Sequence, residues 1–320
     1  MKGEFFMVNA RKIAIIGCGF VGAASAFSLM QSGLFSEMVL IDADQSRAEG
    51  EAMDISHGVP YASPMEIYAG SYQDIADAAI VVITAGASQR PGESRLDLVQ
   101  RNVNIFRSIA PNLVKYHCEG IILVVANPVD ILTAITVKLT GFPENRVFGS
   151  GTVLDTARLK YLIGRHLDVD SRNVNAFIIG EHGDSELAAW SCVRVAGLPL
   201  PDFCELRGHH NDHEAAAERI YEEVKNSAYE IISKKRATYF GVAMAVRRIC
   251  ECIIRDEHSI LPVSRMLHGE YGIDGLALSL PSVVGSDGIG ALVPLRLNEK
   301  ELEGLRLSAK TLQEVFDQIQ

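Results

Sequence analysis

Short apolar runs rich in β-branched residues alternate with longer amphipathic segments along the first half of the chain. Runs such as KIAIIG and AIVVIT are apolar at consecutive positions, which is typical of strands buried on both faces of a sheet. The expected strands are residues 12–17, 38–42, 66–70, 79–84, 120–126 and 146–150, and the expected helices are residues 20–33, 44–57, 96–117 and 129–139. Pro111 is expected to end or kink the third of these helices. This alternation predicts an α/β fold with right-handed crossovers and a doubly wound parallel sheet.

The pattern changes after about residue 150, where longer charged stretches replace the short apolar runs. The expected elements there are a helix at 152–167, a strand at 174–179, a long charged helical stretch at 212–255, strands at 258–268 and 276–285, and a final helix at 298–318. We therefore predict two tightly packed domains, with the parallel sheet in residues 1–150 and a mixed α+β domain in residues 151–320.

Composition and charge argue against several classes of protein. The chain has 320 residues, of which 48% are hydrophobic, and its net charge of −10 disfavours binding to nucleic acid or to anionic membranes. The six cysteines form no CxxC pair, which favours free thiols in a reducing compartment, the cytoplasm. Residues 1–10 lack the apolar core of a signal peptide, and the longest apolar runs are only strand-length, so no membrane span is expected.

The hexapeptide GCGFVG at residues 17–22 is a GxGxxG motif that follows a predicted strand and opens a predicted helix. Gly17 would allow the tight turn, Gly19 would let the backbone approach a pyrophosphate, and Gly22 would let the helix pack close to the sheet. Glycine-rich turns are common, but a turn in this context predicts a Rossmann-type dinucleotide site at a helix N-terminus. The cofactor-binding residues expected from the motif are Gly17, Gly19, Phe20, Val21 and Gly22.

An acidic residue ends the second predicted strand, twenty positions beyond the last of these glycines. Asp42, in VLIDAD, can accept hydrogen bonds from the ribose diol of a dinucleotide and would repel a 2′-phosphate. NAD is therefore predicted as the cofactor in preference to NADP. The alternative interpretation is that Asp42 only caps a helix that starts at Ala43. The agreement of strand, turn, helix and spacing favours the cofactor.

Two further motifs carry groups suited to carbonyl chemistry. Asp155 and Arg158 stand three residues apart in GTVLDTARLKYLIG, on one face of a predicted helix, and His182 follows an apolar strand in GEHGDSE. A lone histidine in such a loop is usually only a surface residue. Reduction of a carbonyl, however, needs a proton donor, a carboxylate to orient it, a guanidinium to grip a substrate carboxylate and a second cation near the carbonyl oxygen. Asp155, His182, Arg158 and Arg95 supply these groups.

Several motifs occur together and in one order along the chain. They are GCGFVG, ITAGASQRPGESRLDLVQRN, ANPVD, GSGTVLDTARL, GEHGDSE and KKRATYFG. In this combination the chain resembles the bacterial-type L-lactate dehydrogenases of the lactate/malate dehydrogenase superfamily, over nearly its whole length. The resemblance implies a cytoplasmic oxidoreductase of fermentative glycolysis that interconverts pyruvate and L-lactate with NAD.

The resemblance also implies roles for individual residues. His182 would donate and accept the proton with Asp155 as its partner, Arg158 would bind the substrate carboxylate, and Arg95 would polarise the ketone. The other implied residues are Asn127 and Thr238 at the substrate, and Asn127, Ser150 and Val242 at the cofactor.

In this superfamily one residue of the loop TAGASQRPGESR selects the substrate, six positions before the catalytic arginine. Malate enzymes carry Arg there, which pairs with a second carboxylate, whereas lactate enzymes carry Gln. Counting back from Arg95 leads to Gln89, which implies pyruvate, because the second carboxylate of oxaloacetate would lack a countercharge. A shift of one residue would place Arg90 there instead. The loop is expected to close as a lid.

Other interpretations stay open from sequence alone. The chain could be a malate dehydrogenase, a dehydrogenase of bulkier 2-hydroxy acids, or a non-catalytic NAD-binding relative. An NAD-dependent glycosidase would need a Cys/His metal set that the sequence does not offer. No metal site is expected, and the cluster His209, His210 and His213 is interpreted as part of a solvated connection.

The resemblance bears on assembly and regulation as well. The segment AMDISHGVP at residues 52–60 is similar to a family segment that packs against another subunit, which implies a homo-oligomer, by family habit a tetramer. Many bacterial relatives respond to fructose 1,6-bisphosphate through an Arg and a His at positions that are Lys160 and Asn175 here. Because Asn adds no charge, we expect activation to be weak or absent.

Overall fold

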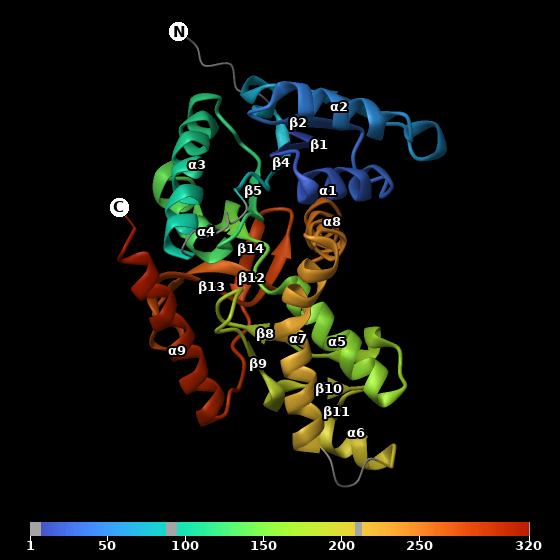
Figure 1. Cartoon of the computed structure of the whole chain (residues 1–320), viewed down its shortest axis with the longest axis vertical. Helices are drawn as coiled ribbons and strands as arrows, with labels where there is room; N and C mark the ends of the chain where they lie inside the picture. Colours follow the sequence, from blue (N-terminus) through green and yellow to red (C-terminus); the bar gives the residue numbers. More distant parts are fainter. Residues whose placement is uncertain (1–7, 88–94, 209–212, 320) are drawn as a thin grey trace.

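A nine-stranded sheet forms the centre of the molecule (Figure 1). The structure, a computed structural model, describes residues 8–87, 95–208 and 213–319. The sheet has the strand order β14-β13-β12-β6-β5-β4-β1-β2-β3, in which β1 to β6 are parallel and follow the order that defines a Rossmann fold. These strands are β1 (Asn9–Ile16), β2 (Glu37–Ile41), β3 (Glu66–Ala69), β4 (Ala78–Ile83), β5 (Ile121–Val124) and β6 (Val147–Gly149). The predicted fold class is confirmed.

The parallel strands send alternate side chains into two different cores. On β1, Ile13 and Ile15 enter one core, whereas Ala14 and Ile16 enter the other. The strands β4 and β5 alternate in the same way. Because both faces are buried, consecutive positions are apolar from Ile13 to Ile16 on β1 and throughout β4 and β5, and this explains the continuous runs from which the strands were predicted.

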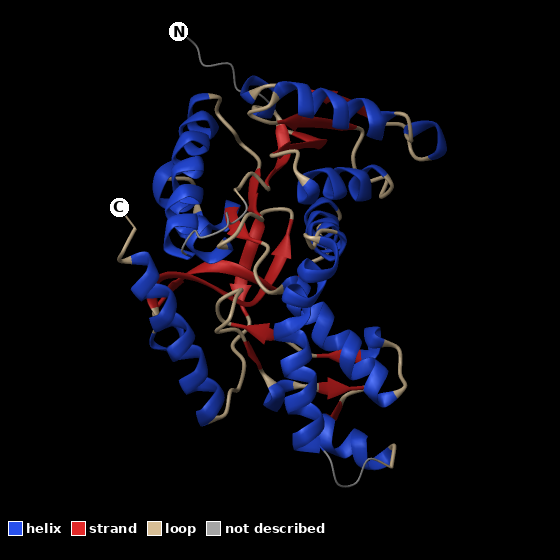
Figure 2. Cartoon of the chain, in the orientation of Figure 1, coloured by secondary structure: helices blue, strands red, loops and turns tan. Residues whose placement is uncertain are grey.

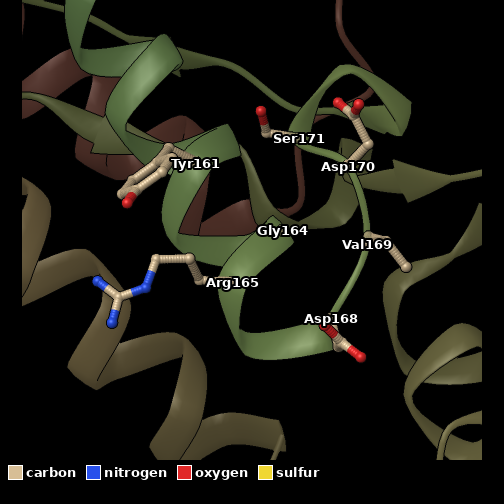
Figure 3. Close-up of a pocket in the computed structure, with 7 residues that line it drawn as sticks. All are labelled: Tyr161, Gly164, Arg165, Asp168, Val169, Asp170 and Ser171. Carbon is tan, nitrogen blue, oxygen red and sulfur yellow. The ribbon is translucent and has the colours of Figure 1, made fainter.

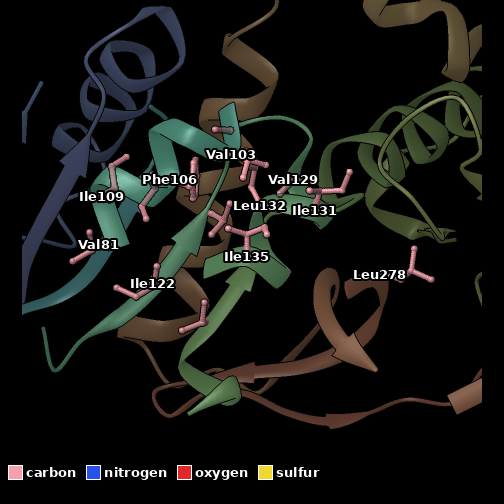
Figure 4. Packing of buried hydrophobic residues seen from close by; sticks show 14 of the residues in the cluster. Val81, Val103, Phe106, Ile109, Ile122, Val129, Ile131, Leu132, Ile135 and Leu278 are labelled. Carbon is pink, nitrogen blue, oxygen red and sulfur yellow. The ribbon is translucent and has the colours of Figure 1, made fainter. Parts of the chain in front are cut away.

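Helices cover both faces of the sheet (Figure 2). The helices α3, α4 and α9 pack on one face, and α1, α2 and α8 pack on the other. Figure 4 shows the first of these cores, in which Val81 and Ile122 of the strands lie with Phe106 of α3 and Leu132 of α4. The helices of the first half are α1 (Phe20–Met30), α2 (Gln45–Ser56), α3 (Arg95–Lys115) and α4 (Val129–Thr140).

Three strands of the second half extend the same sheet. The strand β12 pairs antiparallel with β6, and β13 and β14 continue the sheet in antiparallel order. Two small sheets, β11-β10-β7 and β8-β9, lie in the lower part of Figure 1. The strands are β7 (Val174–Asn175), β8 (Ile178–Ile179), β9 (Leu187–Ala188), β10 (Arg194–Val195), β11 (Leu198–Pro199), β12 (Ser259–His268), β13 (Asp274–Gly285) and β14 (Gly288–Leu292).

The helices of the second half complete the two sheet faces and build a third core. The helices α5 and α7 pack with β7 and β10 around that core, while α8 and α9 reach back to the large sheet. They are α5 (Val153–Leu167), α6 (Leu200–Leu206), α7 (His213–Lys235), α8 (Phe240–Ile254) and α9 (Glu299–Phe316). Within the described ranges, every helix is too short or too polar to cross a bilayer.

Pro111 does not end its helix, so that part of the expectation is wrong. The helix α3 continues through Pro111 to Lys115. Pro111 itself is exposed, whereas Ile109 and Leu113 on either side of it are buried in the core. Packing of these neighbours therefore holds the helix together past the residue that lacks an N–H.

The long helical stretch expected at 212–255 is also wrong, because two helices occupy it. The first ends at Lys235 and the second begins at Phe240, and Arg236 between them has a φ of 72°, in the left-handed region. The strand expected at 174–179 is likewise divided into β7 and β8, and the short elements α6, β9, β10, β11 and β14 were not anticipated. Charge and apolar patterns continue through such breaks, so the sequence does not reveal them.

All six cysteines are free thiols, as expected. Five of them are buried, and Cys192 is half-buried.

Candidate active site

The turn between β1 and α1 is tightly packed against the protein and open on its outer side. A Cβ added to Gly17 would lie 2.4 Å from the Ala85 nitrogen, and one added to Gly22 would lie 1.9 Å from the Gly17 oxygen. The protein's own packing therefore requires glycine at both positions, and Gly17 also has a φ of 102°. A Cβ added to Gly19 would meet no atom within 4 Å. The backbone at Gly19 thus faces open space, which the approach of a pyrophosphate requires.

The N-terminus of α1 lies at this open side. Gly19 is the N-cap and brings no capping side chain, so the first N–H groups, those of Phe20 and Val21, are left for an anion. The Phe20 ring is 70% exposed and stacks on Tyr239 with 5.4 Å between the ring centroids. Val21 and Val242 both pack against the core between α1 and α8. The second half of the chain therefore reaches the cofactor motif through α8 and the residue before it.

Asp42 lies beside the glycine turn. Its Oδ2 accepts a hydrogen bond from the Cys18 N–H at 2.6 Å, and its Oδ1 accepts one from the Asp44 N–H at 2.9 Å. The N-cap of α2 is Asp44, whose side chain accepts from the Arg47 N–H at 3.2 Å, so Asp42 is not the helix cap. Each carboxylate oxygen of Asp42 retains acceptor capacity for a ribose diol. The turn and this carboxylate together fit the pyrophosphate and adenosine ribose of a dinucleotide.

Asn127 and Ser150 follow the carboxyl ends of the neighbouring strands β5 and β6. The Ser150 N–H donates back to the end of β5 at 2.8 Å. Asn127 is exposed, and its carbonyl oxygen accepts from the Asn102 side chain at 2.7 Å. Asn102 was not predicted as a site residue, although it lies in the motif LVQRN. This buried amide also accepts from the Ala87 N–H at 2.7 Å, so it ties Asn127 to the segment that precedes α3.

Asp155, Arg158 and His182 come together at the start of α5. The His182 Nδ1 lies 2.6 Å from Oδ2 of Asp155, and one guanidinium nitrogen of Arg158 lies 2.7 Å from Oδ1 of the same carboxylate. The Asp155 side chain is only 2% exposed, whereas those of His182 and Arg158 are 23% and 15% exposed. One buried carboxylate thus fixes an imidazole and a guanidinium side by side, within reach of a ligand.

The charges of this group shift the pKa values of its members. Burial by itself would lower the pKa of His182, but the charge and hydrogen bond of Asp155 raise it to about 9. Burial would raise the pKa of Asp155, yet His182 and then Arg158 hold it below its ordinary value. The imidazole is therefore a cation at neutral pH, and because Asp155 engages Nδ1, its Nε2 is the nitrogen that can donate outward.

A second carboxylate, which the sequence analysis missed, holds the backbone of the histidine. Asp130 at the start of α4 accepts hydrogen bonds from the His182 N–H at 2.8 Å, from Ser264 Oγ at 2.5 Å and from Ser279 Oγ at 3.4 Å. Asp130 is 1% exposed, and this burial raises its pKa to about 6. Because the serines belong to β12 and β13, Asp130 joins three distant segments behind the histidine. Its only signal in the sequence is its place in ANPVD, three residues after Asn127.

A third acid beside the histidine was also missed. Glu186 is 5% exposed, and its carboxyl oxygen forms a compact group with an Asp155 oxygen and a His182 ring nitrogen. These three atoms all lie within 4.8 Å of one another. Its signal in the sequence is weak, because it is only one of several acids in GEHGDSE.

The remaining predicted residues come just before α8 or just before α3 in the sequence, or at the first residue of α3. Thr238 is half-buried in the link between α7 and α8, next to Tyr239. Gln89 and Arg90 lie outside the described residues, and so does the side chain of Arg95, whose backbone begins α3.

A surface hollow on α5 lies apart from these residues. Figure 3 shows it beside Tyr161, Arg165 and Asp170, toward the C-terminal end of the helix. Asp155 belongs to the first turn of α5, and none of the predicted site residues that the structure describes lines the hollow. The hollow is therefore separate from the charged group at the start of the helix.

The fold and the site together define a class of protein. A glycine-rich turn suited to a dinucleotide lies at the carboxyl ends of the parallel strands. In the second half of the chain, a histidine paired with a carboxylate lies next to an arginine. These are the parts of an NAD-dependent dehydrogenase. Residues 11–149 match the family described as lactate/malate dehydrogenase, NAD binding domain, and residues 152–320 match lactate/malate dehydrogenase, alpha/beta C-terminal domain. The chain belongs to the lactate/malate dehydrogenase family.

Individual relatives are similar over almost the entire chain. The L-lactate dehydrogenase of Acetivibrio thermocellus is 52% identical over 306 residues, which cover 96% of each chain. L-lactate dehydrogenase 1 of Clostridium acetobutylicum is 51% identical over 98% of this chain and 100% of its own length. The solved structure of a minor L-lactate dehydrogenase from Enterococcus mundtii, in its ligands-bound form, has a TM-score of 0.93 at 40% identity and covers 97% of this chain and 98% of that one. The predicted resemblance is confirmed.

Proposed function

We propose that this chain catalyses the NAD-dependent interconversion of pyruvate and L-lactate. The observation that carries the proposal is the pairing of His182 with Asp155 at 2.6 Å, with Arg158 bonded to the same carboxylate. An imidazolium next to a guanidinium matches a 2-keto acid, which offers a ketone oxygen next to a carboxylate. The substrate is supported by the relatives at 51% and 52% identity, both named L-lactate dehydrogenases.

Arg158 is the proposed ligand of the substrate carboxylate. Within the described part of the chain, Asp155 engages one nitrogen of the guanidinium, and the side chain remains 15% exposed. The rest of the planar fork can form two parallel hydrogen bonds to a carboxylate, and Asp155 fixes the orientation of its plane. Asn127 and Thr238 are proposed to contact the substrate from the end of β5 and from the link before α8.

His182 is the proposed proton donor in reduction and the proton acceptor in oxidation. Asp155 orients the ring through Nδ1 and stabilises the imidazolium, so that the Nε2 proton is available to the ketone oxygen. When NADH is bound, it supplies the hydride for the ketone carbon, so pyruvate takes up one hydride and one proton to give lactate. The neutral imidazole that remains regains a proton from solvent, and Asp130 keeps the histidine backbone in place throughout.

The proposed cofactor contacts follow the carboxyl ends of the strands. The glycine turn with Phe20 and Val21 would hold the pyrophosphate, and Asp42 would hold the adenosine ribose. Asn127, Ser150 and Val242 are proposed near the nicotinamide, because they lie after β5, after β6 and on α8. We propose residues 1–150 as the cofactor-binding domain and 151–320 as the substrate domain, a division supported by family matches that end at 149 and resume at 152.

Gln89 and Arg95 are proposed as the residues that choose the substrate and polarise its ketone. Both proposals follow from the family spacing of six residues between these two positions in the sequence. A neutral amide leaves room for the methyl group of pyruvate, whereas the second carboxylate of oxaloacetate would be buried without a countercharge. Pyruvate is therefore the proposed substrate in preference to oxaloacetate.

We further propose a cytoplasmic homo-oligomer, with a tetramer as the form that the family favours. Free thiols support a reducing compartment. The segment 52–60 begins on α2, and large apolar side chains in this segment, directly after it and on α8 are exposed in the single chain. They are Met53, Tyr61, Phe240 and Met244. Such apolar surface supports burial against another subunit.

Activation by fructose 1,6-bisphosphate is proposed to be weak or absent. Lys160 is half-buried, and its burial followed by the charge of Arg248 lowers its pKa. Asn175 is exposed on β7 and brings no charge. Pyruvate saturation measured with and without the bisphosphate tests this, and a large drop in the half-saturating pyruvate concentration would contradict it.

The proposed reaction is tested by steady-state oxidation of NADH with pyruvate, oxaloacetate and 2-ketoisocaproate in parallel. The highest kcat/KM is expected with pyruvate. A wide preference for oxaloacetate would identify a malate enzyme and refute the assignment of Gln89, and a preference for 2-ketoisocaproate would indicate a bulkier substrate class. No turnover with any 2-keto acid would favour a non-catalytic relative.

The variant Gln89→Arg sharpens the same test. It is expected to raise kcat/KM for oxaloacetate relative to pyruvate by at least about tenfold, because a buried ion pair forms where an amide stood. The matched control is Arg90→Gln, which should leave the preference unchanged. If the control changes the preference and Gln89→Arg does not, the register of the loop differs by one residue.

A further inference from the structure

Glu186 is a buried acid next to the catalytic pair that the proposed reaction leaves unused. It lies four residues after His182, directly before β9. The residue is 5% exposed, and its Oε1 has no hydrogen-bond partner among the described residues. A buried carboxylate without a partner is costly, whereas a neutral carboxylic acid in the same place is much less so.

Three elements bring charged or titratable groups to face this carboxyl. The helix α5 contributes Asp155 and Arg158, and the loop between β8 and β9 contributes His182. The helix α7 contributes Lys225, whose charge acts on the carboxyl. It also contributes Tyr221, whose hydroxyl donates to the main-chain oxygen of Glu186 and so fixes the backbone.

The proximity of Asp155 decides the protonation state of Glu186. A carboxyl oxygen of each residue and a ring nitrogen of His182 lie within 4.8 Å of one another. Two like charges at that separation and in a desolvated place repel strongly, so one of the two carboxyls keeps its proton. Asp155 has bonds to both His182 and Arg158, so it is the one that ionises. Burial, and then the charge of Asp155, raise the pKa of Glu186 to about 8.

We propose that Glu186 is a positioning residue that works as a neutral carboxylic acid and sets the charge of the substrate site. With Glu186 neutral, the group formed by His182, Arg158 and Asp155 has an excess of one positive charge, and this excess favours an anionic 2-keto acid. Ionisation of Glu186 cancels this excess, weakens the hold of Arg158 on the substrate carboxylate and favours a histidine that keeps its proton. The inference rests on the proposed function, because it needs an anionic substrate at Arg158.

The pH dependence of kcat/KM for pyruvate tests the proposal. In the wild-type protein both Glu186 and His182 must be protonated, so the alkaline limb should steepen toward a loss of about hundredfold per pH unit. The variant Glu186→Gln keeps the shape and the neutral state but cannot ionise. It should retain activity near neutral pH and show a single-proton limb, which falls by about tenfold per pH unit.

Two further variants separate charge from structure. Glu186→Asp restores an ionisable group and should restore the steep limb. Glu205→Gln, an exposed change on α6, is the matched control and should keep the wild-type profile. The same single-proton limb in the wild type and in Glu186→Gln would overturn the proposal, while pyruvate turnover itself would leave the proposed function standing.

The protonation state of Glu186 can also be measured directly in the wild-type protein. This measurement is needed if a variant does not fold or if pyruvate is not a substrate. Infrared difference spectra of the wild-type protein should show a protonated carboxyl band at pH 7 that disappears as the pH rises through about 8. Absence of any such band at neutral pH would overturn the inference. If the band is present but pyruvate is not turned over, the proposed function is refuted, whereas the proposal that Glu186 is a neutral acid still holds.

Discussion

The glycine turn and the histidine site differ in how their parts are spread along the chain. Gly17, Gly19 and Gly22 lie within six residues, and Asp42 directly follows the next strand, so one βαβ unit contains the whole arrangement. The histidine site is assembled from α4, α5, the loop after β8 and the strands β12 and β13. The glycine turn depends on the geometry of the backbone, whereas the histidine site depends on the distances between charged side chains.

This difference predicts different effects for substitutions in the two regions. The turn is proposed to bind the cofactor through N–H groups and the Asp42 carboxylate, so changes there should alter affinity for the cofactor. The histidine site acts through charges that are stabilised by one another, so changes there should alter rate and pH dependence.

The largest expected effect is that of His182→Gln. Loss of the proton donor should lower kcat for pyruvate reduction by about 10²- to 10⁴-fold. NADH affinity, measured by fluorescence titration of the same variant, should stay within about twofold, because the turn is a separate region. A loss of kcat smaller than about tenfold would mean that another group donates the proton.

Asp130→Asn should have a smaller effect on both stability and rate. An amide cannot accept all the bonds that Asp130 accepts, so a buried donor is left unsatisfied at a cost of about 1–3 kcal/mol in the free energy of unfolding. Denaturant unfolding measures the cost, and kcat should fall less than in His182→Gln. The exposed change Asp287→Asn is the control. Equal stability of the two variants would show that Asp130 does not hold the histidine loop.

Asp42→Asn should give the smallest of these effects and should act on the cofactor alone. Removal of the negative charge should improve kcat/KM for NADPH relative to NADH by about tenfold, or about 1.4 kcal/mol. Asp44→Asn is the matched control, because Asn caps a helix as well as Asp does. A change in preference equal in both variants would remove the ribose role from Asp42.

The sequence predicted the parallel sheet and the glycine turn because both follow from local rules. Consecutive apolar residues on β1 and β4 reflect burial on two faces, and glycine spacing reflects backbone contacts inside one turn. Pro111 shows the limit of such rules, since buried neighbours keep α3 intact past it. The break at Arg236 cannot be seen in the sequence for a different reason, because the charged pattern runs through it.

The grouping of Asp155 and Arg158 could be predicted from their spacing on one helix, and that of His182 from the chemistry it would complete. Asp130 and Glu186 could not be predicted in the same way. Each is one acid among many in the sequence, and only the fold shows which acids are buried beside the histidine. Burial and proximity, which set their protonation, are properties of the assembled chain.

Asp155 is proposed to keep His182 charged so that it can donate a proton, and the pH profile of pyruvate reduction is the most direct test of this role. Burial lowers the pKa of His182, but neighbouring acids, chiefly Asp155, raise it from 6.5 to about 9, so the donor is protonated at neutral pH. With NADH saturating, kcat/KM for pyruvate should remain level through neutral pH and fall only in the alkaline region, while lactate oxidation rises there. A reduction rate that is lost around pH 6.5 would contradict the account.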